Sequence, residues 1–168
     1  NPRFLLLDEP FSSLDALLRV RLREELRRIQ RKLQSTAIFV THDQEEAFSI
    51  SDRVAIMNAG RIMQFDTPEV LYQRPANAFV ARFMGDHNVV SGRGAGSADG
   101  MAVLNVPNGG SFAATGAAAA DGQPIDIGIR TDHVRIGQPG VKGLGFTGTV
   151  SNIEYRGASV KLSVDGAG

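Results

Sequence analysis

The chain has 168 residues, and its 18 basic and 18 acidic side chains give a formal net charge of zero. A chain without excess charge has no general attraction to nucleic acid or to anionic lipid. There is no cysteine, which excludes a disulfide framework and thiol chemistry, and the length suffices for one complete domain or for parts of two.

The first predicted element is an apolar strand that ends in two acids. Phe4 to Leu7 are consecutive apolar residues, typical of a strand buried on both faces of a parallel sheet, and Asp8 and Glu9 follow directly. Ligands of such sheets bind just beyond the carboxyl ends of the strands. One carboxylate can hold Mg²⁺ and the other can orient an attacking water, as phosphoryl transfer requires. The alternative is a buried strand whose Asp-Glu-Pro merely closes a turn.

A charged helix and a second apolar strand follow. Apolar residues at helical spacing predict an amphipathic helix from Leu18 to Leu33 whose arginines form a solvated face, with Glu24 paired to Arg28 at i,i+4. Ala37 to Thr41 then predict a second buried strand, which ends in His42 and Asp43. A second strand thus also delivers a polar group to its end.

The next stretch contains a hairpin and two capped helices. Val54 to Asn58 and Arg61 to Phe65 predict two strands joined by a glycine-containing turn. Thr67 followed by proline predicts the start of a helix, and Asn77 predicts the start of another that stops before Gly85.

Composition changes near His87, which predicts a domain boundary. Of the 19 glycines, 17 lie at or beyond Gly92, whereas 24 of the 36 charged side chains lie before His87. The segment from Gly92 to Gly122 is rich in Gly, Ala and Ser and is interpreted as a variable linker and loop region. Short strands are predicted beyond it, at the alternating isoleucines 125, 127 and 129 and at residues 147–155 and 158–164, as in a small barrel.

Three motifs in order resemble those of the ATP-binding cassette (ABC) ATPases, namely LLLDEP at residues 5–10, SSLD at 12–15 and THD at 41–43. The stretch from Thr41 to Met84 is similar to the bacterial importer branch, which energises uptake of polyamines, ferric iron, sugars, sulfate or phosphonates. Residues 127–134 and 153–157 resemble the transport-associated OB domain of that branch, although Thr131-Asp132-His133 stands where Pro-Glu-His is commoner. The resemblance implies an α/β fold, part of a P-loop NTPase cassette, over residues 1–86, and an incomplete all-β OB-like barrel over residues 87–168.

The resemblance also implies roles for four residues, with ATP and Mg²⁺ as cofactors. Asp8 corresponds to the Walker B aspartate, which holds Mg²⁺ through water, and Glu9 to the catalytic carboxylate. His42 corresponds to the switch-loop histidine that reaches the γ-phosphate, where a donor stabilises developing charge. Asp15 corresponds to the D-loop aspartate, which contacts the partner subunit of the dimer, although Ser-x-x-Asp also suits a helix cap.

Two motifs of a complete ABC ATPase do not occur in the sequence. There is no G-x-x-x-x-G-K-[ST] phosphate loop and no Leu-Ser-Gly-Gly-Gln signature. Without a loop of backbone N–H groups and a lysine, nothing cradles the phosphates. The chain is therefore expected to be a C-terminal piece of a longer protein, clipped at its last domain and inactive alone.

The implied function is an ATP-hydrolysing subunit that energises import, as a homodimer bound to integral membrane permease subunits and, through them, a substrate-binding protein. It would lie peripherally on the cytoplasmic face of the bacterial inner membrane, and the permease and binding protein would choose the substrate. One alternative is a regulatory β-barrel fragment with a cassette remnant. Another, a cassette ATPase of DNA repair or translation, is disfavoured because residues 67–84 lead into a transport-type barrel.

Nucleic-acid binding and a protein-only metal site are both disfavoured. OB surfaces that bind nucleic acid stack bases on aromatics, and the tail offers only Phe112, Phe146 and Tyr155 with scattered charge. His87 and His133 stand apart from other residues at ligand spacing. We therefore expect no nucleic-acid partner.

Overall fold

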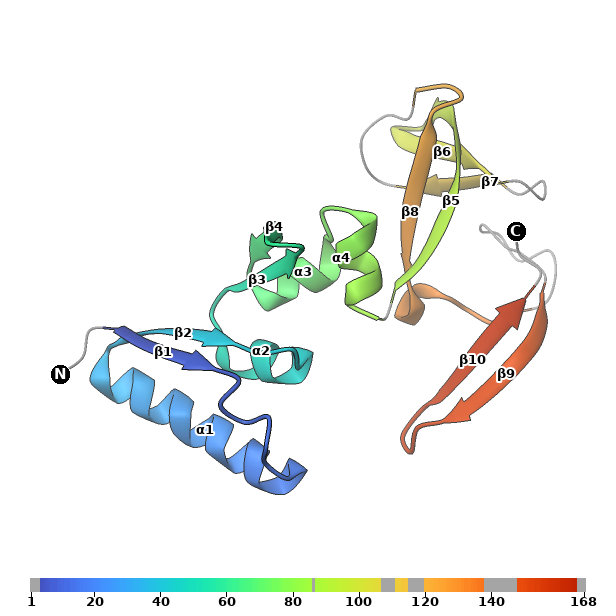
Figure 1. Ribbon diagram of the computed structural model, residues 1–168. Coiled ribbons are helices and arrows are strands. Elements are labelled where there is room, and N and C mark those ends of the chain that lie inside the picture. The colour runs from blue at the N-terminus through green and yellow to red at the C-terminus, as the bar shows by residue number, and fades with distance from the viewer. Residues whose placement is uncertain (1–3, 86, 107–110, 115–119, 138–147, 166–168) are drawn as a thin grey trace. The chain divides into compact units, whose positions relative to one another are not determined.

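The computed structural model describes residues 4–85, 87–106, 111–114, 120–137 and 148–165 (Figure 1). The chain separates into two compact units, Asn1–Met84 and Gly85–Gly168. Within the described ranges, the first unit combines α-helices with strands, and the second consists of strands and a short 3-10 turn. None of the helices in these ranges has the length and apolar character needed to cross a bilayer.

The first unit begins with a β-α-β arrangement. Strand β1 (Phe4–Asp8) leads into helix α1 (Ala16–Leu33), and the chain returns as β2 (Thr36–Val40), which pairs with β1 in parallel. Asp8 lies opposite Val40 in this register, so both strands end at the same edge. The two predicted strands and the helix between them are confirmed.

The burial of this sheet differs from expectation. Phe4 and Leu6 are each 72% exposed, and Ile38, opposite Leu6, is 57% exposed. Burial on both faces needs a covering layer on each side of the sheet, and α1 lies along one side of the pair (Figure 1). In the described part of the chain, the opposite face of β1 and β2 therefore presents apolar side chains to solvent.

Local side-chain contacts define the start and the surface of α1. The Asp15 carboxylate accepts a hydrogen bond from the Leu18 N–H at 2.9 Å and thereby caps the helix. Arg28 donates two hydrogen bonds to the carboxylate of Glu25, so the predicted pairing of Arg28 with Glu24 is wrong. Arg28 thus contacts both carboxylate oxygens of Glu25, three residues earlier, and such two-point contacts between arginine and a carboxylate are stronger than single ones.

The rest of the first unit follows the predicted order. Helix α2 (Gln44–Ile50) precedes a hairpin of β3 (Val54–Asn58) and β4 (Arg61–Asp66), and α3 (Pro68–Gln73) and α4 (Ala78–Phe83) come after it. The predicted caps are confirmed, because the side chains of Thr67 and Asn77 accept hydrogen bonds from backbone N–H groups in the first turns of α3 and α4. Ile56, Leu71, Val80 and Met84 form the buried core of these elements.

The second unit contains a curled four-stranded antiparallel sheet in the order β7-β6-β5-β8. Its strands are β5 (His87–Ala98), β6 (Met101–Asn105), β7 (Ser111–Ala114) and β8 (Pro124–Arg130). The first part of β5 pairs with β8 and the last part with β6, so this long strand is hydrogen-bonded to two neighbours. Leu104, Val106 and Phe112 form the core, against the inward side chains of isoleucines 125, 127 and 129.

A short 3-10 turn, η1 (Thr131–His133), follows β8, and a separate antiparallel pair consists of β9 (Thr149–Tyr155) and β10 (Val160–Asp165). The two predicted strands in this region are confirmed, except that Thr147 lies outside the described residues. The unit is thus a curled β-structure, and a closed OB-like barrel remains a prediction.

The interpretation of residues 92–122 as linker and loops is wrong, because β5, β6 and β7 occupy most of their described part. Gly92 shows why the glycine-rich composition misleads. A Cβ atom there would lie 2.3 Å from the carbonyl oxygen of Asn105 and 2.7 Å from Cδ1 of the buried Leu104. Glycine at this position permits close approach of two strands, which is a packing role and not a sign of a flexible loop.

Candidate functional site

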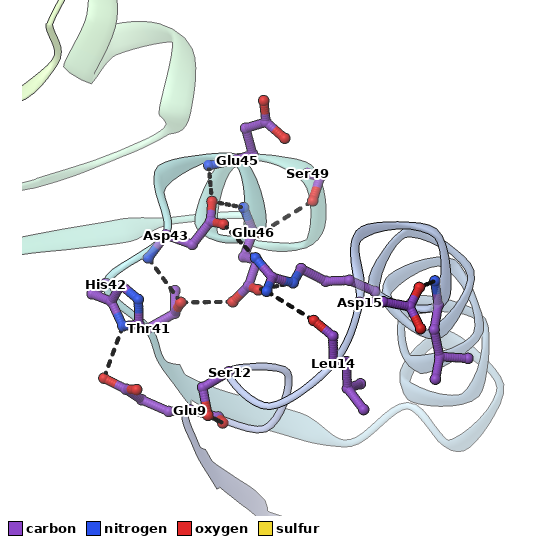
Figure 2. Close-up of polar contacts among 12 residues, drawn as sticks. Glu9, Ser12, Leu14, Asp15, Thr41, His42, Asp43, Glu45, Glu46 and Ser49 are labelled. Atoms are coloured by element: carbon purple, nitrogen blue, oxygen red, sulfur yellow. Dashed lines mark hydrogen bonds and ion pairs between the residues drawn. The ribbon is translucent and has the colours of Figure 1, made fainter.

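Glu9 and His42 meet at the carboxyl edge of the β1–β2 pair (Figure 2). Glu9 is the first residue after β1, and its backbone N–H donates to the carbonyl of Val40 at 2.8 Å. His42 follows the end of β2, and its Nδ1 lies 3.1 Å from Oε1 of Glu9. Parallel pairing places both side chains beyond the same sheet edge and thereby brings an acid and an imidazole together.

The turn after β1 holds Glu9 in a special backbone conformation. Its φ of 43° lies in the left-handed region, which residues other than glycine rarely adopt. The Glu9 carbonyl accepts hydrogen bonds from the backbone N–H of Ser12 at 3.3 Å and from its hydroxyl at 3.0 Å. Phe11 is buried, and its ring packs on Phe39 of β2 with centroids 5.6 Å apart. The turn is therefore anchored to the neighbouring strand.

Side-chain hydrogen bonds also order the loop that carries His42. The Thr41 hydroxyl donates to Oε2 of Glu46 at 2.6 Å and accepts from the Asp43 N–H at 3.0 Å. Asp43 caps α2, because its Oδ1 accepts from the N–H groups of Glu45 at 2.8 Å and of Glu46 at 3.2 Å. Figure 2 shows this chain of contacts leading from Thr41, the neighbour of His42, into the first turn of the helix.

Arg19 of α1 joins this loop to the segment after β1. Its Nη1 donates to Oδ2 of Asp43 and its Nη2 to the carbonyl of Leu14, both at 3.1 Å, while Nε lies 3.5 Å from Oε1 of Glu46. The arginines of this helix were expected to form a solvated face. Arg19 departs from that expectation, since its side chain is 27% exposed and faces Asp43, the cap of α2, and Glu46 within α2.

The Glu9–His42 contact alters the titration of the imidazole. The hydrogen bond that the imidazole donates to the Glu9 carboxylate, together with the charge of that carboxylate, raises the pKa of His42 above the ordinary value of 6.5, and the charges of Glu46 and Asp43 act in the same direction. The His42 side chain is 75% exposed and that of Glu9 45%. The ion pair is thus open to solvent and to any ligand that approaches this edge.

Replacing Glu9 by glutamine is expected to lower the pKa of His42, because the largest cause of its elevation is removed. An NMR titration of the His42 ring in both chains would measure the change, with the His133 signal as an internal reference. Because the folded-state pKa is raised, the stability that the pair contributes is present below pH 6.5 and is lost as pH rises through the raised value. An identical His42 titration in the two chains would contradict the contact.

Asp8 and Asp15 have different surroundings. Asp8 is the last residue of β1 and is exposed, and Asp15 is engaged as the cap of α1. Carboxylate oxygens are ligands that Mg²⁺ prefers, so Asp8 is chemically suited to such an ion. Among the described residues, no group of three or more His, Cys, Asp or Glu is arranged to hold a metal.

A small hollow lies between the two loops, with a volume of about 30 Å³. It is lined by Glu9, Ser12, Arg19, Thr41, His42, Asp43 and Glu46. A cavity volume of about 10–15 Å³ suffices to hold one water molecule. The hollow is thus water-sized, and a nucleotide would need further groups beyond its lining.

The sequence patterns placed Arg19 on a solvated helix face and Glu46 in the first turn of a helix, and assigned neither residue a part in the site. A glutamate three residues after a helix cap commonly turns back to the cap's own backbone, whereas Glu46 here reaches Thr41. Arg19 and Asp43 are 24 residues apart, so no local spacing connects them. The Asp43-x-x-Glu46 spacing, which resembles a helix-capping pattern, is the sequence signal that could have indicated side-chain contacts in this loop.

Comparison with known proteins gives the family context. Residues 127–168 match the TOBE domain family. The chain is 41% identical to "Spermidine/putrescine import ATP-binding protein PotA" of Oleidesulfovibrio alaskensis, over 98% of this chain and 45% of that protein. It is 42% identical to "Fe(3+) ions import ATP-binding protein FbpC" of Brucella abortus, over 98% of this chain and 46% of that protein.

A third relative, "Uncharacterized ABC transporter ATP-binding protein YdcT" of Escherichia coli, is 42% identical over 98% of this chain and 42% of its own length. The chain thus spans less than half the length of each of these three proteins. The similarity to each of them extends over 98% of this chain. The chain is thus similar over nearly all of its length to ATP-binding proteins of ABC transporters, two of them named for import, and its residues 127–168 match the TOBE domain.

Proposed function

We propose that this chain is part of an ATP-hydrolysing subunit that energises substrate import, with the Glu9–His42 edge as its catalytic site. The observation that carries the proposal is the 3.1 Å contact between Glu9 and His42 at the carboxyl ends of two parallel strands. Ligands of parallel sheets bind at this edge. An acid and an imidazole held there by the fold are the groups that water activation and charge stabilisation require.

In this proposal each residue of the site has a separate role. Glu9 orients and polarises the attacking water, which the adjacent water-sized hollow can admit. Asp8 would help to hold Mg²⁺, which would partly neutralise the charge on the phosphoryl group that ATP transfers. His42, with its raised pKa, donates a hydrogen bond towards the γ-phosphate position. Asp15 stays a candidate for the dimer contact in addition to its role as helix cap.

The domain assignment and the partners belong to the same proposal. Residues 1–86 would form the C-terminal part of a nucleotide-binding domain and residues 87–168 a transport-associated OB-like domain. The subunit would work as a homodimer on membrane permease subunits, at the cytoplasmic face of the membrane, and receive its substrate through a binding protein. Relatives are named for spermidine, putrescine or Fe(3+) import, so the substrate class is not narrowed by them.

The 168-residue chain by itself is expected not to hydrolyse ATP measurably. It contains no phosphate loop, and the negative charge of Asp8 and Glu9 repels nucleotide unless Mg²⁺ intervenes. A steady-state ATPase assay of the purified chain tests this, with a complete subunit that includes a phosphate loop and signature as the positive control. Turnover by the chain alone at the rate of the complete subunit would contradict the expectation.

A further inference from the structure

The backbone on both sides of His42 is held by one hydroxyl group. The hydroxyl of Thr41, the residue before His42, accepts from the N–H of Asp43, the residue after it, at 3.0 Å and donates to Oε2 of Glu46 at 2.6 Å. His42 itself is exposed, and within the described part of the chain its ring contacts the Glu9 carboxylate. Its position therefore depends on its neighbours.

The carboxylate that Thr41 contacts is buried. Glu46 is 2% exposed, and a buried charge is stable only if it is paired and hydrogen-bonded. Its two oxygens have different partners, the Thr41 hydroxyl on Oε2 and the Arg19 guanidinium on Oε1. Glu46 is thus fixed between the His42 loop and helix α1.

Arg19 extends the connection to the other catalytic loop. The same guanidinium that faces Glu46 and Asp43 donates to the carbonyl of Leu14, in the segment that follows Glu9. A planar guanidinium holds several acceptors in a rigid arrangement, so their relative positions are constrained. The loops that carry Glu9 and His42 are therefore tied through a single side chain.

We propose that Thr41, Glu46 and Arg19 form a positioning network that holds His42 against Glu9. Thr41 is the positioning residue nearest to His42, Glu46 fixes Thr41, and Arg19 sets the distance between the two loops. The catalytic meaning of this network rests on the proposed function, whereas the geometry that it enforces is a property of the folded chain.

Thr41→Val tests the network without changing any charge. Valine matches threonine in shape but lacks the hydroxyl, so the Glu46 and Asp43 contacts are lost together while every charge near His42 stays. Thr41→Ser keeps the hydroxyl and is the matched rescue. Both are compared with the unaltered chain and with Glu9→Gln, in which His42 lacks its carboxylate partner.

The measurement is the ¹⁵N chemical shift of both ring nitrogens of His42 at one fixed pH, assigned with a His42→Gln variant. Thr41→Val is expected to shift these signals towards those of Glu9→Gln, and Thr41→Ser to restore the original values. Arg19→Gln, which removes the tie to Leu14, is expected to shift them in the same direction. His42 signals unchanged in a folded Thr41→Val chain would overturn the proposal, and so would loss of folding in both Thr41→Val and Arg19→Gln, because the network would then serve folding alone.

The catalytic consequence is read separately, in a complete subunit. Thr41→Val is expected to lower kcat by about tenfold or more with KM unchanged, since misplacing a reacting group by about 1 Å has cost up to hundredfold elsewhere. Thr41→Ser is expected to restore kcat. If the ring signals move as expected but kcat does not, the proposed function fails and the positioning network stands.

Discussion

Replacing Glu9 by glutamine in a complete subunit is expected to abolish ATP hydrolysis almost entirely while leaving nucleotide binding intact. Glutamine preserves the size and the hydrogen-bonding capacity of the side chain but not its charge, so water is no longer activated at the sheet edge. Mg²⁺ and ATP would still bind through Asp8 and the phosphate loop, and ATP-bound dimers would accumulate. ATPase rate, nucleotide affinity and ATP-dependent dimerisation, each measured on the same preparation, would check this result.

Asp8→Asn provides the matched comparison, because it removes one charge from the neighbouring residue. Here the Mg²⁺ site is weakened, so nucleotide affinity should fall together with the rate. The contrast between the two variants separates water activation from metal binding. Near-normal hydrolysis by Glu9→Gln would mean that Glu9 is not the group that activates water.

Replacing His42 by alanine is expected to lower ATP turnover by a factor on the order of a hundred or more, as removal of one preorganised donor does in other enzymes. The imidazole lies at the end of β2, is exposed, and has a pKa raised by Glu9, so it can present a proton to a phosphate oxygen. The expected loss is mainly in kcat, because the donor is needed where charge develops. Single-turnover kinetics would separate this step from nucleotide binding.

His133→Ala is the control for that measurement. His133 is also exposed but belongs to η1 of the second unit, far along the sequence from the residues of the β1–β2 edge. Its replacement should leave turnover unchanged. Equal hydrolysis by His42→Ala and the unaltered subunit would remove His42 from the site.

Elements with strong local signals followed from the sequence alone. The hairpin of β3 and β4, the caps at Thr67 and Asn77, and the apolar strands β1 and β2 all correspond to predicted features. Each depends on residues within about one turn or one strand, where periodicity and capping chemistry act directly. The motif order also singled out Glu9 and His42, which the structure brings into contact.

The tertiary structure decided which distant residues meet. Arg19, expected at a solvated face, contacts Asp43 and Glu46 because parallel pairing of β1 and β2 places the start of α1 beside the start of α2. Gly92 lies in β5 opposite Ile125 of β8, and the close approach of Asn105 of β6 leaves no room for a Cβ there, which composition cannot reveal. In both cases the determining contact joins segments far apart in sequence. Sequence alone therefore determined the local elements and the two candidate catalytic residues, whereas chain folding decided the network that surrounds them.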